Sequence, residues 1–172
     1  MITVAVDGSS LSNPGPAGWA WYVDDGCWAC GGWPSATNNR GELTALLAVL
    51  RASRDAGRSG EPLIVLADSQ YVINSVTKWM RGWKLRGWRK GDGKRVINAD
   101  LMQDLDVALL GRQVRFEWVR GHAGHPLNEA ADERARGAAL EYQARRVPAS
   151  GPGFDGFTGD EVPVAASEKR HP

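Results

Sequence analysis

The sequence predicts an α/β fold: a mixed five-stranded sheet whose first three strands form an antiparallel meander, with helices packed on the sheet. Three strand-like segments separated by turn signals open the chain, and helix-like and strand-like segments then alternate. The length of 172 residues fits one domain, and 42% hydrophobic with 24% charged residues is a globular composition. No apolar run approaches the ~18 residues that a membrane span needs, so we expect no membrane partner.

Alternation and turn residues predict the first three strands. Residues 2–6 alternate apolar and polar side chains, which is the period of a strand. The turn cluster at 13–16 leads into a second strand around residues 18–23. Asp25-Gly26 is a hairpin signal, after which residues 27–33 return as the third strand. Hairpins join antiparallel neighbours, and these segments therefore predict a meander.

A helix and a buried strand follow the meander. Asn39 resembles a helix N-cap, because Glu42 stands three residues later as in a capping box. A stripe at helical spacing then runs to near Gly57, and its apolar members are Leu43, Leu46, Leu47 and Leu50. Residues 63–67 form a continuous apolar run, as expected for a strand covered on both faces.

The second half of the chain supplies further helices and the last strand. Asp68-Ser69 can cap the helix that carries Tyr71, Val72 and Val76. Residues 100–110 predict a short helix, and residues 114–119 predict another strand. A final helix is marked by a stripe of small and apolar residues, namely Leu127, Ala131, Ala135, Ala138 and Ala139.

Charge is concentrated in one segment, although the net charge of the chain is only +1. Residues 78–95 hold eight basic residues against the single acid Asp92, a balance of +7 that leaves −6 for the rest. Trp79, Trp83 and Trp88 lie within it. Cations interleaved with aromatic rings are typical of surfaces that bind phosphate backbones and stack on bases. The alternative is a solvated helix face, and the three tryptophans favour nucleic acid.

Four acids stand at the ends of elements or on inner faces: Asp7, Glu42, Asp68 and Asp132. Each has an ordinary explanation as a turn former, a capping residue or one member of an i,i+4 ion pair. Spacing alone indicates only that Asp7 and Asp68 end neighbouring strand-like runs and can share one edge of a sheet.

Short motifs surround these acids in a fixed order. They are Asp7-Gly8-Ser9, Asn13-Pro14-Gly15-Pro16, Thr37-Asn38-Asn39-Arg40 with Glu42, Asp68-Ser69-Gln70-Tyr71-Val72, and Gly121-His122-Ala123-Gly124-His125-Pro126 followed by Asn128-Glu129 and Asp132. Together they closely resemble bacterial ribonuclease HI, of the ribonuclease H family, over about residues 1–145. A single motif would be weak, whereas five in this order are specific.

The resemblance implies a ribonuclease H-like fold and an endonuclease that cuts the RNA strand of RNA–DNA hybrids. The products would carry 3′-hydroxyl and 5′-phosphate ends. It implies two Mg²⁺ ions, with Mn²⁺ able to substitute, held by Asp7, Glu42, Asp68 and Asp132. It also implies that His122, in a glycine-flanked loop, assists proton transfer or product departure. The residue types agree with this, because hard cations such as Mg²⁺ take oxygen ligands. Two such cations in one site are suited to phosphodiester hydrolysis.

The resemblance also implies two sets of substrate contacts. It places Gly8, Ser10, Asn38 and Gln70 beside the RNA strand, and it places Asn13, Thr37, Asn39, Trp79 and Trp83 beside the DNA strand. The basic segment within 78–95 corresponds to a protruding handle that grips the hybrid and adds Lys84, Arg86, Trp88, Arg89 and Lys90. Gly82 departs from the asparagine of the best-known members, and Gly41 is unusual because glycine weakens the first turn of a helix.

Two rival functions share this fold, and a third belongs to another class. A non-catalytic hybrid-binding module would lack a carboxylate, and a related DNA nuclease or transposase domain would lack the handle. The third rival is a redox protein, suggested by Cys27-Trp28-Ala29-Cys30. A thioredoxin-like motif begins a helix, whereas this one lies in a predicted strand, where residues i and i+3 face opposite sides.

Domain organisation and location are expectations of the same kind. We expect one catalytic domain over residues 1–145 and a disordered or loosely held tail over 146–172, because the tail is rich in proline and glycine. No signal-peptide pattern opens the sequence and it has two cysteines, so we expect the protein in the cytoplasm. We also expect a monomer with no obligate protein partner.

Overall fold

The computed structural model describes residues 1–157. Its strands are β1 (Ile2–Ser10), β2 (Gly15–Asp24), β3 (Cys27–Ala36), β4 (Leu63–Ala67) and β5 (Val114–Trp118). Its helices are α1 (Asn38–Asp55), α2 (Gln70–Asn74), the π-helical turn η1 (Ser75–Trp79), α3 (Met80–Leu85), α4 (Ala99–Ala108) and α5 (Pro126–Gln143). None of the helices in this range combines the length and the apolarity that crossing a membrane would require.

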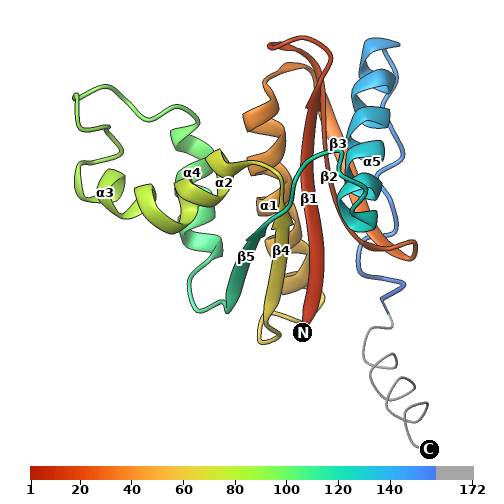
Figure 1. Ribbon diagram of the computed structural model, residues 1–172, viewed down its shortest axis with the longest axis horizontal. Coiled ribbons are helices and arrows are strands. Elements are labelled where there is room, and N and C mark those ends of the chain that lie inside the picture. Colours follow the sequence, from red (N-terminus) through yellow and green to blue (C-terminus); the bar gives the residue numbers. More distant parts are fainter. Residues whose placement is uncertain (158–172) are drawn as a thin grey trace, which may run out of the picture.

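The strands form one mixed sheet in the order β3-β2-β1-β4-β5 (Figure 1). β1 pairs antiparallel with β2, and β2 pairs antiparallel with β3, which confirms the predicted meander. β4 pairs parallel with both β1 and β5. Parallel neighbours need a crossover connection, and the segment from α2 to α4 supplies the one between β4 and β5.

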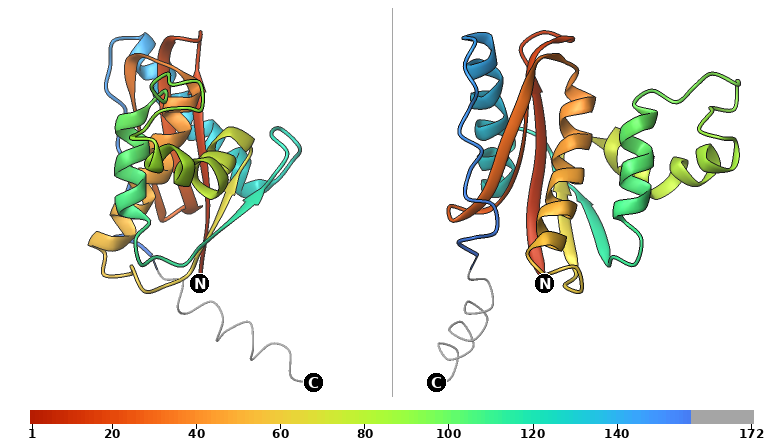
Figure 2. Two further views of the ribbon diagram at one scale, coloured as in Figure 1. Left: turned by 90° about the vertical axis from the view of Figure 1, so that its left-hand side faces the viewer. Right: turned by 180° about the vertical axis from the view of Figure 1, so that it is seen from behind.

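Helices α1 and α5 cover opposite faces of the sheet (Figure 2). On β1, Val4 and Val6 pack in the cluster formed with α1, whereas Ala5 packs in the cluster that includes Ala131 of α5. Successive side chains of a strand point to opposite faces, so one strand serves two cores. The apolar residues that α5 buries are alanines, namely Ala131, Ala135, Ala138 and Ala139, which lets the helix lie close to the sheet.

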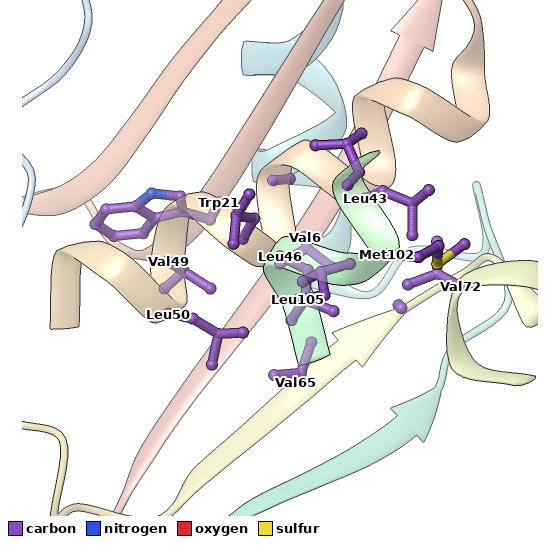
Figure 3. Close-up of a cluster of buried hydrophobic side chains, with 14 of the residues drawn as sticks. Val6, Trp21, Leu43, Leu46, Val49, Leu50, Val65, Val72, Met102 and Leu105 are labelled. Carbon is purple, nitrogen blue, oxygen red and sulfur yellow. The ribbon is translucent and has the colours of Figure 1, made fainter. Parts of the chain in front are cut away.

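The larger core lies between the sheet, α1 and α4 (Figure 3). Leu43, Leu46 and Leu50 of α1 are fully buried, with Val65 of β4 and Met102 of α4 beside them. Burying one such side chain stabilises the fold by about 1.5–3 kcal/mol. The leucine stripe predicted from sequence is therefore the core-facing side of α1.

Helix α1 begins two residues earlier than predicted, because Thr37 and not Asn39 is its N-cap. The Thr37 backbone is extended, and its hydroxyl accepts a hydrogen bond from the Arg40 amide at 3.2 Å. Asn38 and Asn39 are already helical and exposed. β3 ends at Ala36, so the chain enters the helix without an intervening loop. The earlier start leaves the two asparagine side chains free of a capping role.

Gly41 is explained by a close approach between α1 and the sheet. A Cβ at Gly41 would lie 2.8 Å from the carbonyl oxygen of Gly18 and 3.1 Å from the Cα of Gly8. Glycine costs about 1 kcal/mol relative to alanine inside a helix. Here it lets the start of α1, and Glu42 with it, lie directly against β1.

The handle is a protrusion that extends from one side of the body (Figure 1). It follows α2, includes η1 and α3, and returns through a loop to α4. Within the loop, Arg89 pairs with Arg95 as an antiparallel bridge, and the Trp88 backbone takes a positive φ of 65°. The indole of Trp88 packs against the main core, which anchors the loop to the body.

Residues 147–157 pack on the domain, which corrects the prediction of a loosely held tail for this part of the chain. The Phe154 ring stacks on the buried Trp21 with ring centroids 5.1 Å apart. The Phe157 ring lies 4.4 Å from the guanidinium carbon of Arg58. Two aromatic anchors within a glycine- and proline-rich segment escape an argument from average composition. The rest of the predicted tail, residues 158–172, lies outside the described residues.

The same segment covers the outer edge of the sheet. The Cys30 amide of β3 donates to the Ser150 carbonyl at 3.0 Å, and Trp28 pairs with Gly153 as an antiparallel bridge. An uncovered edge strand exposes unpaired backbone groups that can pair with other chains. Residues 149–153 satisfy part of the β3 edge and belong to the folded unit.

Truncation after Arg146 is expected to lower the melting temperature by about 4–12 °C. Removing Phe154 from Trp21 costs about 2–3 kcal/mol of buried apolar surface, and each kcal/mol shifts Tm by roughly 2–4 °C in a domain of this size. Calorimetry or thermal circular dichroism measures the change. Truncation after Phe157, which keeps every contact described above, is the control. An unchanged Tm for the shorter chain would show that the aromatic contacts contribute nothing to stability.

Candidate active site

Three carboxylates come together where the end of β4 meets β1 and the start of α1. Val6 is paired with Ala67 in the parallel register, so the residues that follow them, Asp7 and Asp68, lie side by side. Glu42 joins them from α1. Carboxylate oxygens of Asp7, Glu42 and Asp68 all lie within 4.8 Å of one another. Three segments that are distant in sequence therefore converge on one point.

Asp132 approaches this carboxylate group from the opposite face of the sheet. It lies on α5, which packs against β1, and its negative charge helps to raise the pKa of Asp7. It is not part of the group formed by Asp7, Glu42 and Asp68, whose carboxylate oxygens lie within 4.8 Å of one another. The structure thus places the four predicted acids in one neighbourhood, with three in close contact and the fourth beside Asp7.

Burial and mutual repulsion raise the pKa of two of the carboxyls. Asp7 is 3% exposed. Its burial, with the charges of Asp68, Glu42 and Asp132, raises its pKa to about 9, although the Gly8 amide donates to its Oδ1 at 2.9 Å. Burial is also the largest cause at Glu42, and it raises the pKa of that carboxyl to about 8. Without positive charge, these side chains hold protons at neutral pH.

The donor set fits a hard divalent cation. All three groups are carboxylates, and Mg²⁺ binds to one or a few carboxylates together with water and substrate phosphates. Among the described residues, neither a cysteine nor a histidine belongs to this group, which disfavours a structural zinc site. A cation would also replace the protons that Asp7 and Glu42 otherwise retain.

Replacing Asp7 by Asn is expected to stabilise the metal-free protein at neutral pH while abolishing metal-dependent activity. Between pH 4 and pH 9 the folded Asp7 keeps its proton while the unfolded one, with a pKa near 3.8, releases it. The folded state then binds more protons than the unfolded state, so stability falls as pH rises, by up to about 1.4 kcal/mol per pH unit. Asn removes this penalty and can still accept from the Gly8 amide.

Thermal unfolding in EDTA at several pH values measures this effect. The Tm difference between the Asp7→Asn protein and the wild type should be largest near pH 8 and should shrink as pH falls toward 4. Mg²⁺ should raise the Tm of the wild type and leave that of the variant nearly unchanged. A variant less stable than the wild type throughout this range would contradict the electrostatic argument.

His122 lies in an exposed loop between β5 and α5. Its backbone has a positive φ of 57°, which few residues other than glycine adopt. No hydrogen bond or ion pair among the described residues joins its imidazole to the carboxylates. The preceding residue is close to them, because a Cβ at Gly121 would lie 2.9 Å from Oδ2 of Asp68. The loop thus begins at the acidic cluster and carries His122 at its surface.

Several predicted substrate contacts surround the start of α1. The Asn38 amide donates to Oδ1 of Asn13 at 3.2 Å, which links the β1–β2 connection to α1. The Ser10 hydroxyl donates to the Ala36 carbonyl at 3.2 Å and also to the Ser12 carbonyl. Thr37 caps the helix, and Asn39, like Gln70 at the start of α2, is exposed. Short polar groups and backbone therefore form the rim around the carboxylates.

The predicted handle residues differ in how they can reach a ligand. Trp79 is 42% exposed, whereas Trp83 is 8% exposed and packs in the main core. The two rings lie 6.0 Å apart. They line one pocket of about 360 Å³ whose other walls are Tyr71, Lys90, Val96 and Ile97. Trp79 and Lys90 form the more exposed walls of the pocket, and Trp83 forms its buried side.

The other basic residues of the handle partly stabilise the handle itself. Lys84 pairs with Asp106 of α4 at 2.9 Å. Nε of Arg86 donates to the Arg89 carbonyl at 3.1 Å, and Arg89 donates to the Gly93 carbonyl at 3.0 Å. The Lys84 side chain is more than half exposed, and both arginines are exposed. All three residues therefore still present positive charge to solvent.

Sequence reasoning missed two side chains near the carboxylates. Arg40 forms a bidentate pair with Asp100 at 2.9 and 3.4 Å and also contacts Asn98, which ties the start of α1 to α4. The indole of Trp118, at the end of β5, donates to the Asp68 carbonyl at 3.1 Å. Both follow from tertiary contacts alone. The only local signal was that Trp118, a large aromatic residue, ends a strand just before the motif that begins at Gly121.

The cysteine pair does not form a redox site. Both residues are free, and they lie on opposite faces of β3, with Cys27 in the α1 cluster and Cys30 in the α5 cluster. Burial raises the pKa of Cys27 to about 12, so the nucleophilic thiolate is absent at neutral pH. These contacts confirm the expectation of ordinary strand cysteines.

Comparisons with known proteins agree with this geometry. The family model for RNase H matches residues 1–140. The ribonuclease H of Tropheryma whipplei (strain Twist) is 53% identical over 153 residues, which cover 89% of this chain and 93% of the relative. The crystal structure of LC9-RNase H1, a type 1 RNase H with the type 2 active-site motif, matches at a TM-score of 0.68 and 29% identity, covering 100% of this chain and 86% of that one.

A further solved structure has the same fold with low identity. It is LC11-RNase H1 in complex with an RNA/DNA hybrid, which matches at a TM-score of 0.63 and 20% identity over 83% of this chain and 99% of that chain. The sheet order, the convergent carboxylates, the family model and the relative at 53% identity all point the same way. The chain belongs to the ribonuclease H family.

Proposed function

We propose that this chain is an endoribonuclease that hydrolyses the RNA strand of RNA–DNA hybrids and leaves 3′-hydroxyl and 5′-phosphate ends. The observation that carries the proposal is the convergence of Asp7, Glu42 and Asp68, with oxygens within 4.8 Å, in a member of the ribonuclease H family. Uncompensated carboxylates at this spacing repel one another. A site of this kind is retained where the charge serves a bound cation.

The carboxylates would hold two divalent cations, Mg²⁺ or Mn²⁺. When bound, such a pair activates the attacking water and stabilises the leaving oxygen in an in-line displacement. Asp7, Glu42 and Asp68 are the proposed ligands, with Asp132 beside Asp7 as the fourth. Their backbones belong to a sheet and two helices, so the ligands stand in place before substrate binds, and little reorganisation accompanies the reaction.

His122 is proposed to move protons at the edge of the site. Its imidazole is exposed on a loop, so it can approach a departing product or metal-bound group and then retreat. An imidazole can donate or accept a proton, which suits general acid and base assistance. This role requires only that the loop can reach the cluster, and the loop begins beside Asp68, since a Cβ added at Gly121 would lie 2.9 Å from its Oδ2.

Strand discrimination is proposed to rest on the rim of polar groups. The 2′-hydroxyl distinguishes RNA from DNA, and close backbone or short polar side chains are suited to recognise it. Gly8, Ser10, Asn38 and Gln70 are the proposed contacts for the RNA strand. The DNA strand would then run past Asn13, Thr37 and Asn39 toward the handle, where Trp79, Trp83, Lys84, Arg86, Trp88, Arg89 and Lys90 bind it through stacking and charge.

The test compares three end-labelled duplexes, namely an RNA–DNA hybrid, duplex RNA and duplex DNA, each with Mg²⁺ or with EDTA. We expect cleavage of the RNA strand of the hybrid alone, and none in EDTA. Products that a DNA polymerase can extend, and that ligate through a 5′-phosphate, would establish the end chemistry. Equal cleavage of duplex DNA, or an intact hybrid in Mg²⁺, would contradict the proposal.

A further inference from the structure

Asp68 lies in the short connection between β4 and α2, and the residues on either side of it are hydrogen-bonded. It lies between the last residue of β4 and Ser69, whose hydroxyl caps α2 by accepting from the Val72 amide at 3.2 Å. On its other side, the Val119 amide donates to the Ala67 carbonyl at 3.0 Å and extends the β4–β5 ladder by one residue. The chain is thus held at Ala67 and at Ser69, on either side of Asp68.

Trp118 adds a contact to Asp68 that no ladder bond supplies. It is paired with Ala67 across the parallel strands, and its indole N–H reaches one residue farther to the Asp68 carbonyl oxygen at 3.1 Å. The same segment passes close to the Asp68 carboxylate, because a Cβ added at Gly121 would lie 2.9 Å from Oδ2. Residues 118–121 therefore run beside Asp68, and Trp118 holds its carbonyl.

The exposure of Trp118 argues against a purely structural role. Its side chain is 52% exposed, so the packing it contributes to the core is limited. A large aromatic ring left half in solvent gains little from burial, and its defined interaction is the N–H bond to a residue of the acidic cluster. Groups behind a metal ligand orient it, and their removal typically costs ten- to a hundredfold in affinity or activity.

We propose that Trp118 is a positioning residue that fixes Asp68, through its backbone carbonyl, in the orientation needed for cation binding. The expected change in kcat rests on the proposed function, whereas the expected change in metal affinity does not depend on any substrate. Loss of the N–H should let the Asp68 peptide rotate and should place the carboxylate less accurately. Metal affinity and turnover should then fall together, without loss of substrate binding.

The test is Trp118→Phe, which keeps an aromatic ring and removes the donor. Trp33→Phe is the matched control, because Trp33 is a half-buried tryptophan on β3, at the edge of the sheet opposite β5, and its indole N–H has no hydrogen-bond partner among the described residues. For each protein we would measure the Mn²⁺ dissociation constant by calorimetry without substrate, kcat and KM on an RNA–DNA hybrid, and Tm. Mn²⁺ is the probe because it binds carboxylate sites and can be followed directly.

For Trp118→Phe we expect Mn²⁺ affinity and kcat each to fall about three- to tenfold. KM and Tm should stay nearly unchanged, because the lost hydrogen bond goes to a backbone carbonyl and is partly exposed to solvent. Trp33→Phe should leave Mn²⁺ affinity and kcat as in the wild type. Unchanged Mn²⁺ affinity in Trp118→Phe would overturn the inference, and so would a raised KM with normal kcat, which would mark a substrate contact. A wild type that binds Mn²⁺ but cuts no hybrid would reject the proposed function alone.

Discussion

Replacing Asp68 by Asn is expected to reduce hybrid cleavage in Mg²⁺ by about 10³-fold or more while the fold remains intact. The substitution keeps the size of the side chain and removes one charge from the group of three that lies within 4.8 Å. Metal ions contribute several kcal/mol of transition-state stabilisation, and each 1.36 kcal/mol corresponds to about tenfold in rate. The backbone contacts of Asp68, including the Trp118 bond to its carbonyl, do not depend on the carboxylate.

Binding and catalysis should separate in this variant. Most of the affinity for nucleic acid comes from phosphate contacts with basic side chains, which lie in the handle and not in the acidic cluster. Filter binding should therefore give a dissociation constant for the hybrid close to that of the wild type. Asp104→Asn is the control, since Asp104 lies on α4 in an exposed pair with Arg51 at 3.7 Å. Near wild-type cleavage by Asp68→Asn would remove Asp68 from the metal site.

Local sequence patterns were sufficient for the architecture. Alternation in residues 2–6 and the apolar run at 63–67 correspond to β1 and β4, and the Asp25-Gly26 turn joins β2 to β3 as predicted. The reason is physical: burial of one or both strand faces imposes a period, and turn geometry imposes particular residues. Even the shared edge of Asp7 and Asp68 could be inferred, because it follows from two parallel strands that end together.

Long-range convergence was beyond such patterns. No local rule brings Glu42 to Asp7, since that contact depends on Gly8 and Gly41 allowing α1 to lie against β1. The resemblance to a family supplied the carboxylate set, and the structure adds its geometry. The hydrogen bond from Trp118 to Asp68 joins residues 50 positions apart in sequence, and an aromatic residue at a strand end was its only local signal.

The errors have specific physical causes. Asn39 and Glu42 have the spacing of a capping box. The Thr37 hydroxyl, however, already accepts the hydrogen bond of the Arg40 amide, so the helix begins earlier. The C-terminal segment is polar and rich in turn residues on average, yet Phe154 packs on Trp21 and Phe157 packs on Arg58. Composition describes a segment as a whole, whereas docking depends on one or two side chains.

Gly8→Ala is expected to lower kcat by about 10²-fold, although it adds only a methyl group. A Cβ at Gly8 would lie 2.5 Å from the Glu42 amide nitrogen, 2.8 Å from the Asn38 carbonyl oxygen and 2.8 Å from the Gly41 carbonyl carbon. All three atoms are backbone, so no side-chain rotation relieves the contact. The start of α1 must move away from β1, and displacements of about 1 Å at a reactive site can cost 10²-fold.

The displacement carries Glu42 away from Asp7 and Asp68, so Mn²⁺ affinity should fall together with kcat, and overpacking should cost about 1–3 kcal/mol of stability. Assays well below the Tm separate the two effects, because a folded population close to complete cannot explain a 10²-fold loss. Gly137→Ala is the matched control: a Cβ there meets nothing within 4 Å, and alanine favours the α5 helix. Normal kcat and Mn²⁺ affinity in Gly8→Ala would mean that the position of Glu42 relative to β1 is not what assembles the site.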